Sequence, residues 1–168
     1  MPAFRTTLAA LAVAACALVP ASAQAQQSKD AAKADVATWG KALSAAFTPG
    51  YWEGEMQELD STGKVVNSDN KPDCIKEGEA GKLGASLGEM FNMIVDMADC
   101  TTQSGGPGSL NLTMSCSAPG GKQMTFASSG AFTDGQVSWT VDFKAQGEGA
   151  PESRSMRMTA RKTKTTCS

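Results

Sequence analysis

The cysteines constrain this 168-residue chain more than any other feature of its sequence. Five are present, and the chain has no histidine. Cys16 lies in an apolar N-terminal run, which leaves an even set of four in the remainder: Cys74, Cys100, Cys116 and Cys167. No two of them have the C-x-x-C spacing that is typical of a zinc site. Two disulfides are therefore expected, since exposed thiols are oxidised outside the cytoplasm.

The first 25 residues have the pattern of a secretory signal peptide. Arg5 precedes an apolar run over residues 8–19, and small residues follow, so that cleavage is expected after Ala23 or Ala25. The run is 12 residues long, which is shorter than the roughly 20 apolar residues that a transmembrane helix needs. We therefore expect no membrane span and a periplasmic or secreted mature protein.

A lipoprotein signal is the alternative interpretation of this segment. Residues 13–16, Val-Ala-Ala-Cys, match a lipobox, in which Cys16 becomes a lipid-bearing first residue. The apolar run continues past Cys16 to Val19, however, where a lipoprotein usually turns polar. Both signals export the protein, so the expected compartment does not depend on the choice between them.

Removal of the signal peptide leaves 143 residues, a length that suits one compact domain with an ordinary core. The formal net charge of the chain is only −2. Such a balance creates no field that attracts nucleic acid or an anionic membrane. We therefore expect no nucleic-acid partner.

Hydrophobic periodicity predicts two helices. Residues 26–48 form an amphipathic segment in which apolar positions recur at helical spacing, and Pro49 and Gly50 end it. A second apolar stripe predicts a helix from Leu83 to Met97. The first helix is expected to pack as an N-terminal appendage on a β domain that covers residues 49–168.

Most of the β domain alternates between apolar and polar side chains, which predicts antiparallel strands with one wet face and one covered face. The expected strands cover residues 51–56, 110–116, 124–126, 137–143 and 155–160. The expected fold class is mainly β (α+β). It is a curved antiparallel sheet, or a partly open barrel or sandwich, with two helices and two disulfides.

The layout of the strands suggests how the cysteines pair. Cys100 and Cys116 flank the turn 105–108 at similar distances, so they are expected to face each other across a hairpin. Cys74 then pairs with Cys167, which ties the last residues to the segment before the second helix. In the chain-entropy model, closing this long loop stabilises the fold by about 4 kcal/mol.

Taken together, these features resemble a known family. The residues that carry the resemblance are Thr48-Pro49-Gly50-Tyr51-Trp52-Glu53, an isolated Cys74, Asp99-Cys100, Ser115-Cys116-Ser117 and the terminal Cys167. From about Pro49 to Ser168 the pattern resembles the envelope family known as domain of unknown function 3617. The resemblance implies export and a cysteine-bridged β fold. That family has no established activity, so the resemblance assigns no functional residues.

The residue types argue against an enzyme. Without histidine, the common Ser-His and Cys-His arrangements for activating a nucleophile are excluded. Glu53 and Glu55 lie two apart on one predicted strand and share a face, as a carboxylate pair does. Solvated strand residues are the favoured interpretation of both. We therefore expect no catalytic residue and no cofactor.

The methionines suggest two hypotheses. Met90, Met93 and Met97 lie on one side of the second predicted helix, and Met156 and Met158 share a strand face. Thioethers are soft ligands for Cu(I), so a methionine-based periplasmic copper protein is one hypothesis. Methionine also fills irregular apolar surfaces, and copper sites usually recruit histidine as well. We therefore favour packing and expect no metal site.

The last predicted strand is basic. Arg157 and Arg161 share the face opposite Met156 and Met158. A phosphate-bearing envelope lipid is a candidate partner for this face, whereas a solvated face that protects a sheet edge is favoured.

The function expected from these patterns is non-catalytic binding of an apolar or amphipathic envelope molecule, held between the sheet and the methionine-lined helix. The partner expected is a hydrophobic or lipid-like small molecule. The candidate binding residues are Trp52, Met90, Met93, Met97, Trp139, Met156, Met158, Arg157 and Arg161.

Overall fold

The computed structural model describes residues 21–70, 72–147 and 151–167. The predicted signal peptide lies mostly outside the described residues, and so does the lipobox cysteine, Cys16. The first helix, α1, spans Ala21–Ala46. The predicted cleavage positions after Ala23 and Ala25 fall in its first turns and stay predictions. Neither described helix is both long and apolar enough to cross a membrane.

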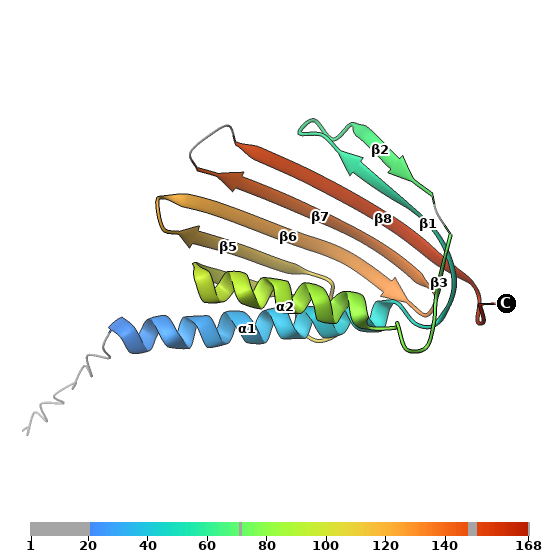
Figure 1. Ribbon diagram of the computed structural model, residues 1–168, viewed down its shortest axis with the longest axis horizontal. Coiled ribbons are helices and arrows are strands. Elements are labelled where there is room, and N and C mark those ends of the chain that lie inside the picture. Colours follow the sequence, from blue (N-terminus) through green and yellow to red (C-terminus); the bar gives the residue numbers. More distant parts are fainter. Residues whose placement is uncertain (1–20, 71, 148–150, 168) are drawn as a thin grey trace, which may run out of the picture.

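The described strands form one antiparallel sheet of eight, which curves without closing (Figure 1). The strand order is β2-β1-β8-β7-β6-β5-β4, and β3 pairs with β1 on the same side as β2. The strands are β1 Gly50–Leu59, β2 Val65–Asp69, β3 Asp73–Ile75, β4 Asp99–Ser104, β5 Leu112–Ala118, β6 Lys122–Thr133, β7 Gln136–Gln146 and β8 Glu152–Lys164. The expected fold class is confirmed, in its open form.

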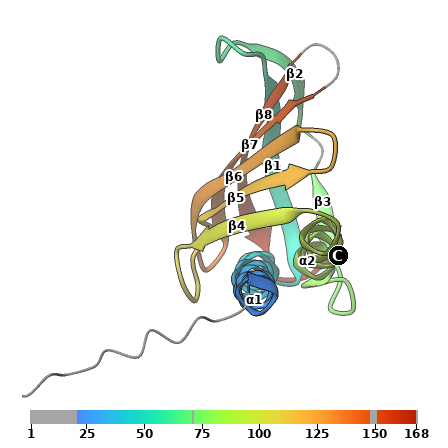
Figure 2. The ribbon, with the colours of Figure 1, turned by 90° about the vertical axis from the view of Figure 1, so that its left-hand side faces the viewer.

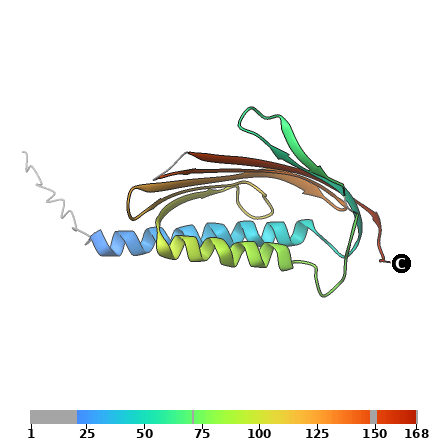
Figure 3. The same cartoon turned by 45° about the horizontal axis from the view of Figure 1, so that its top comes forward.

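The second helix, α2, spans Lys82–Met97 and lies beside α1 under one face of the sheet (Figures 2 and 3). We call this face the inner face. The helices approach closely because glycines meet at their contact: a Cβ atom on Gly84 would lie 2.6 Å from the backbone nitrogen of Ser44. Helix α1 lies against β4, so the pair covers the β4 side of the inner face and not the β1 side (Figure 2).

The core lies between the helix pair and strands β5 and β6. Trp39 of α1 is fully buried, and its ring lies 5.5 Å from Phe91 of α2 and 5.7 Å from Phe126 of β6. Phe91 and Phe126 lie 4.4 Å apart, a spacing at which aromatic rings attract each other. The other fully buried large side chains are Val36, Leu43, Val95, Leu110, Leu112 and Met114.

Two disulfides join elements of this fold in the pairing expected from the strand layout. Cys100 and Cys116 are direct partners on β4 and β5, with Cα atoms 4.1 Å apart. Cys74 of β3 is joined to Cys167, which follows β8, with Cα atoms 5.6 Å apart. The second disulfide spans 93 positions of the chain.

Candidate functional site

One side of α2 is apolar yet faces neither α1 nor the core. Residues three or four apart share a helix face, and the buried face of α2 consists of Gly84, Gly88, Phe91 and Val95. The neighbouring face, which we call the α2 stripe, consists of Leu83, Leu87, Met90, Ile94 and Met97. Leu83, Met90 and Met97 are 45%, 41% and 72% exposed. The stripe extends over about 21 Å at 1.5 Å per residue and contains no charged side chain.

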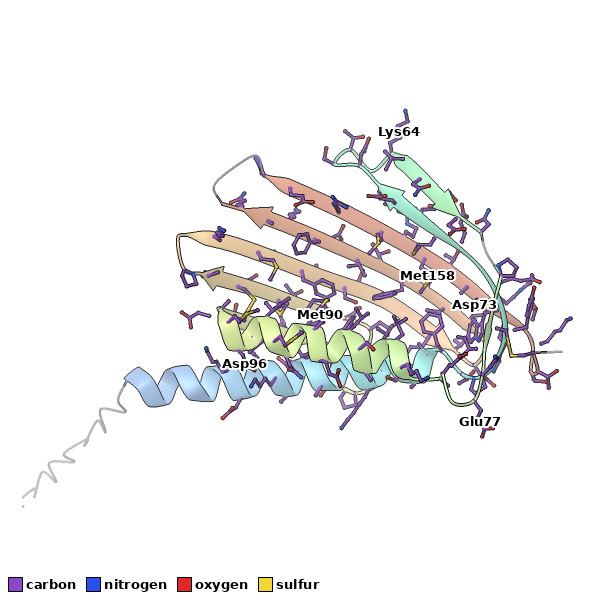
Figure 4. The ribbon with its side chains drawn as sticks, in the orientation of Figure 1. Lys64, Asp73, Glu77, Met90, Asp96 and Met158 are labelled. Carbon is purple, nitrogen blue, oxygen red and sulfur yellow. A yellow bond between two sulfur atoms is a disulfide. The ribbon has the colours of Figure 1, made fainter. Side chains whose placement is uncertain are left out.

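The inner face of the sheet carries a second apolar surface, on β7, β8 and β1. Strand register places Trp139 opposite Met158, and Met158 opposite Met56. The next row along pairs Val141 with Met156. Met56 and Met156 are about half exposed, because the helix pair covers only the β4 side of this face. Figure 4 marks Met90 on α2 and Met158 on β8, one from each surface.

Two hollows lie between the α2 stripe and the inner face, one at each end of α2. The first, of about 660 Å³, is lined by Leu83 of α2 and by Trp52, Met56 and Met158 of the sheet. The second, of about 420 Å³, is lined by Ile94 and Met97 of α2 and by sheet residues that include Met124. We call the two hollows, together with the α2 stripe that runs between them, the groove. Both hollows and the stripe expose apolar side chains, the usual lining of a small-molecule site.

Acidic side chains lie at the first hollow, near β3. Its lining includes Asp73 and Glu79, and also Glu55 of β1 and Asp69 of β2. Asp73 accepts a hydrogen bond from the backbone nitrogen of Cys74 at 2.7 Å, and Glu79 accepts one from that of Lys76 at 3.3 Å. Asp73 and Glu79 therefore hold the local backbone, in the segment that forms the end of the groove.

A buried hydrogen-bond cluster fixes the position of Trp139 on the inner face. The indole nitrogens of Trp39 and Trp139 both donate to Ser128 Oγ, and that hydroxyl donates to the backbone oxygen of Leu110. Ser128 is 4% exposed. A hydroxyl has one donor and two acceptor positions, so all three are used here. The cluster joins α1, β6 and β7, and it holds Trp139 in place on the inner face.

The structure brings together most of the residues that the sequence suggested for a binding site. Trp52 and Met158 line the first hollow, and Met97 lines the second. Met90 lies on the α2 stripe between them, whereas Trp139 and Met156 lie beside Met158 on the inner face. Trp52 is almost fully buried at the first hollow, where its indole nitrogen donates to the backbone oxygen of Thr48 at 2.9 Å. Trp52 therefore forms part of the floor, whereas the methionines offer exposed contact area.

Three predicted residues lie away from the groove. Met93 is 59% exposed, and a step of three residues turns it about 60° around the helix from Met90, off the stripe. Arg157 and Arg161 alternate with Met156 and Met158 along β8, so they lie on the outer face of the sheet. A ligand in the groove does not meet either guanidinium group.

A third hollow, of about 630 Å³, lies on the outer face and includes Glu53, Glu55 and Arg161 in its lining. The Gln57 amide and the Ser68 hydroxyl donate to Glu55 Oε1, both at 2.8 Å. These two hydrogen bonds hold the pKa of Glu55 below its usual range. Glu55 is therefore ionised at neutral pH, where it accepts hydrogen bonds and does not supply a proton.

Sequence reasoning missed Met56, Leu83, Leu87 and Ile94 as groove residues. The three on α2 fit a helical stripe, which usually marks a core face. The signal that distinguishes the two faces is Gly84, which lies on the buried face and at which a Cβ atom would clash with Gly40 and Ser44 of α1.

Comparison with known proteins identifies the family but no characterised relative. No curated protein and no solved structure gives a significant match to the chain. The family model described as protein of unknown function (DUF3617) matches residues 47–167. The match covers most of the chain, including β1, both disulfides and every strand of the sheet. The chain therefore belongs to this family of proteins of unknown function.

Proposed function

We propose that this protein is exported to the periplasm, where it binds an elongated apolar or amphipathic molecule in the groove without catalysing a reaction. The observation that carries the proposal is the exposed apolar α2 stripe, which together with the inner face of the sheet lines a hollow at each end of α2. The signal-peptide pattern supports export.

The exposure of the methionines favours a ligand-binding role over a role in core packing. Soluble proteins rarely leave a continuous apolar surface open unless it binds something. Met56, Met90, Met97 and Met156 are all at least 41% exposed. Methionine side chains adapt their shape, and they are used at surfaces that accept varied apolar partners. A flexible chain fits such a lining better than a rigid polar ligand does.

Affinity should depend on the length of the apolar ligand. Each methylene group removed from water contributes about 0.8 kcal/mol. The α2 stripe is long enough for an extended chain that reaches from one hollow to the other. Affinity is therefore expected to rise with chain length until the ligand fills the groove.

Dye displacement tests this function. The protein is titrated with Nile red, an apolar dye whose emission rises on leaving water, and the bound dye is then displaced with octanoate or palmitate. We expect saturable dye binding and displacement by palmitate at lower concentration than by octanoate. Absence of dye binding, or equal displacement by both acids, would contradict the proposal.

Export is tested separately. The intact mass of protein recovered from a periplasmic fraction should correspond to cleavage after Ala23 or Ala25, or to a lipid-bearing Cys16 if the alternative signal operates. An uncleaved chain found only in the cytoplasm with free thiols would refute it.

A further inference from the structure

Both ends of the segment that carries α2 are tied to the rest of the sheet by disulfides. Cys74 precedes the helix and is joined to Cys167, beyond the end of β8. Cys100 follows the helix and is joined to Cys116 of β5. Since α2 forms one wall of the groove, each disulfide holds one end of that wall.

The two disulfides differ in their access to solvent. Cys100 and Cys116 are 3% and 4% exposed and belong to the core. Cys74 is half-buried, and Cys167 is exposed. Thiol–disulfide exchange requires direct approach of a thiolate to a sulfur atom. A reductant can therefore reach Cys167 while Cys100 and Cys116 remain shielded by the fold.

The exposed disulfide holds the end of the groove. Cys74 lies in the short strand β3, and the lining of the first hollow includes Cys74, Ile75, Glu79 and Gly81. Besides the disulfide, this segment is held by three paired positions between β3 and β1, by a hydrogen bond from Ser44 Oγ to the backbone oxygen of Gly81, and by packing of Ile75 against the core. A ladder this short adds little stability of its own.

We propose that Cys74–Cys167 is a redox latch on the groove, an inference that rests on the proposed binding function. With the disulfide intact, residues 73–81 close the first hollow and ligand is retained. Reduction frees this end wall, lets water into the hollow and releases ligand. The buried Cys100–Cys116 disulfide keeps the other end of α2 in place, so the change stays local.

The exchange step needs a dithiol as reductant. A thiolate of the dithiol attacks Cys167 Sγ and forms a mixed disulfide, while Cys74 leaves as a thiolate and takes up a proton. The second thiol of the reagent then displaces Cys167, which leaves as a thiol. Two electrons and two protons pass to the protein, and the dithiol becomes an oxidised cyclic disulfide.

Graded reduction with dithiothreitol tests the latch on the full mature protein. Alkylation of free thiols followed by peptide mass spectrometry should show Cys74 and Cys167 modified at reductant concentrations that leave Cys100 and Cys116 joined. Over the same range, the dissociation constant for Nile red should rise about tenfold. Hydrogen exchange should increase at residues 73–81 and stay unchanged in β5 and β6.

A double variant that lacks the Cys74–Cys167 disulfide distinguishes the effect of breaking this bond from other effects of dithiothreitol. The Cys74→Ser/Cys167→Ser protein should bind Nile red as weakly as the reduced wild type, and dithiothreitol should change its binding no further. Equal reduction of both disulfides would overturn the latch. If the oxidised protein binds the dye and the reduced protein and the double variant bind it equally well, the latch is wrong while the binding function stands. An oxidised protein that binds no dye overturns both.

Discussion

The indole nitrogens of Trp39 and Trp139, from α1 and β7, donate to one hydroxyl oxygen, Ser128 Oγ, at 3.0 and 2.8 Å. Because each indole approaches from a different element, the hydroxyl fixes the position of the helix relative to the sheet. Trp139 also lies beside Met158 on the inner face. The same buried contact therefore stabilises the core and fixes the position of Trp139 on the inner face.

Ser128→Ala should lower the free energy of unfolding by about 2 kcal/mol, because it leaves the Trp139 indole donor without its partner. Trp39 keeps a second acceptor, the backbone oxygen of Leu110, at 3.2 Å. The measurement is urea denaturation followed by tryptophan fluorescence. Ser129→Ala, at an exposed position on the same strand, is the matched control and should change stability by less than about 0.5 kcal/mol. Equal effects of the two changes would show that the cluster contributes nothing.

Substitution of glycine by alanine should have opposite effects on stability at two positions of α2. Gly84→Ala places a methyl group against Gly40 and Ser44 of α1, so it should destabilise the protein by about 1–3 kcal/mol. Gly88→Ala meets no atom within 4 Å and should stabilise it by about 0.5–1 kcal/mol through helix propensity. Thermal unfolding of both variants checks the pair. A result in which both substitutions stabilise would mean that the helices are not in this close contact.

Two methionines one turn apart should respond differently to charge. Met90 lies on the α2 stripe and Met93 does not, although both are exposed. Met90→Glu places a carboxylate in the groove, where an apolar ligand would have to desolvate it, so Nile red affinity should fall about tenfold. Met93→Glu is the control and should leave the affinity within about twofold. The dissociation constants of both variants are measured by titration with Nile red. A larger loss of affinity in Met93→Glu than in Met90→Glu would mean that the ligand does not bind along the α2 stripe.

Asp60 makes the β1–β2 turn sensitive to acid. The hydroxyl of Thr62 and the backbone nitrogens of Lys64 and Thr62 donate to its carboxylate and hold its pKa below the usual value. A carboxyl group whose pKa is lower in the folded state adds stability above its unfolded pKa. That stability is lost as the pH falls through the folded pKa.

The test compares wild type with Asp60→Asn, which keeps an acceptor oxygen and removes the charge. Wild type should be the more stable protein at neutral pH, and the difference should shrink as acid protonates Asp60. The measurement is the free energy of unfolding of both proteins at a series of acidic pH values. A difference that is independent of pH would show that the charge of Asp60 does not matter.

Local patterns in the sequence predicted much of this fold. Alternation along residues 137–143 marked β7, and the spacing of Cys100 and Cys116 around a glycine-rich turn indicated that they face each other. Both signals act within one strand or one hairpin. The short strand β3 escaped prediction because it has only three residues.

The sequence suggested a binding site between the sheet and the second helix but not which face of that helix stays open, because periodicity shows which residues share a face and not what covers it. The stripe from Leu83 to Met97 resembles a core-facing surface, yet the core contact is made by the neighbouring face with Gly84 and Phe91. Glycine contributes almost nothing to a hydrophobic pattern. Only the packing of α1 on α2, and of Trp39 on the sheet, determines which face stays open.

The order of the cysteines along the chain adds a demand on folding. Cys100–Cys116 is nested within the larger loop closed by Cys74 and Cys167. If the chain emerges from its N-terminal end and its cysteines are oxidised in the order in which they appear, Cys74 pairs with Cys100. That pairing is not the native one. The correct isomer requires Cys74 to wait until three further cysteines have emerged, or a later exchange reaction that repairs the first bond. Unless Cys74 stays unpaired until Cys167 is available, the native pairing therefore depends on rearrangement of an early disulfide.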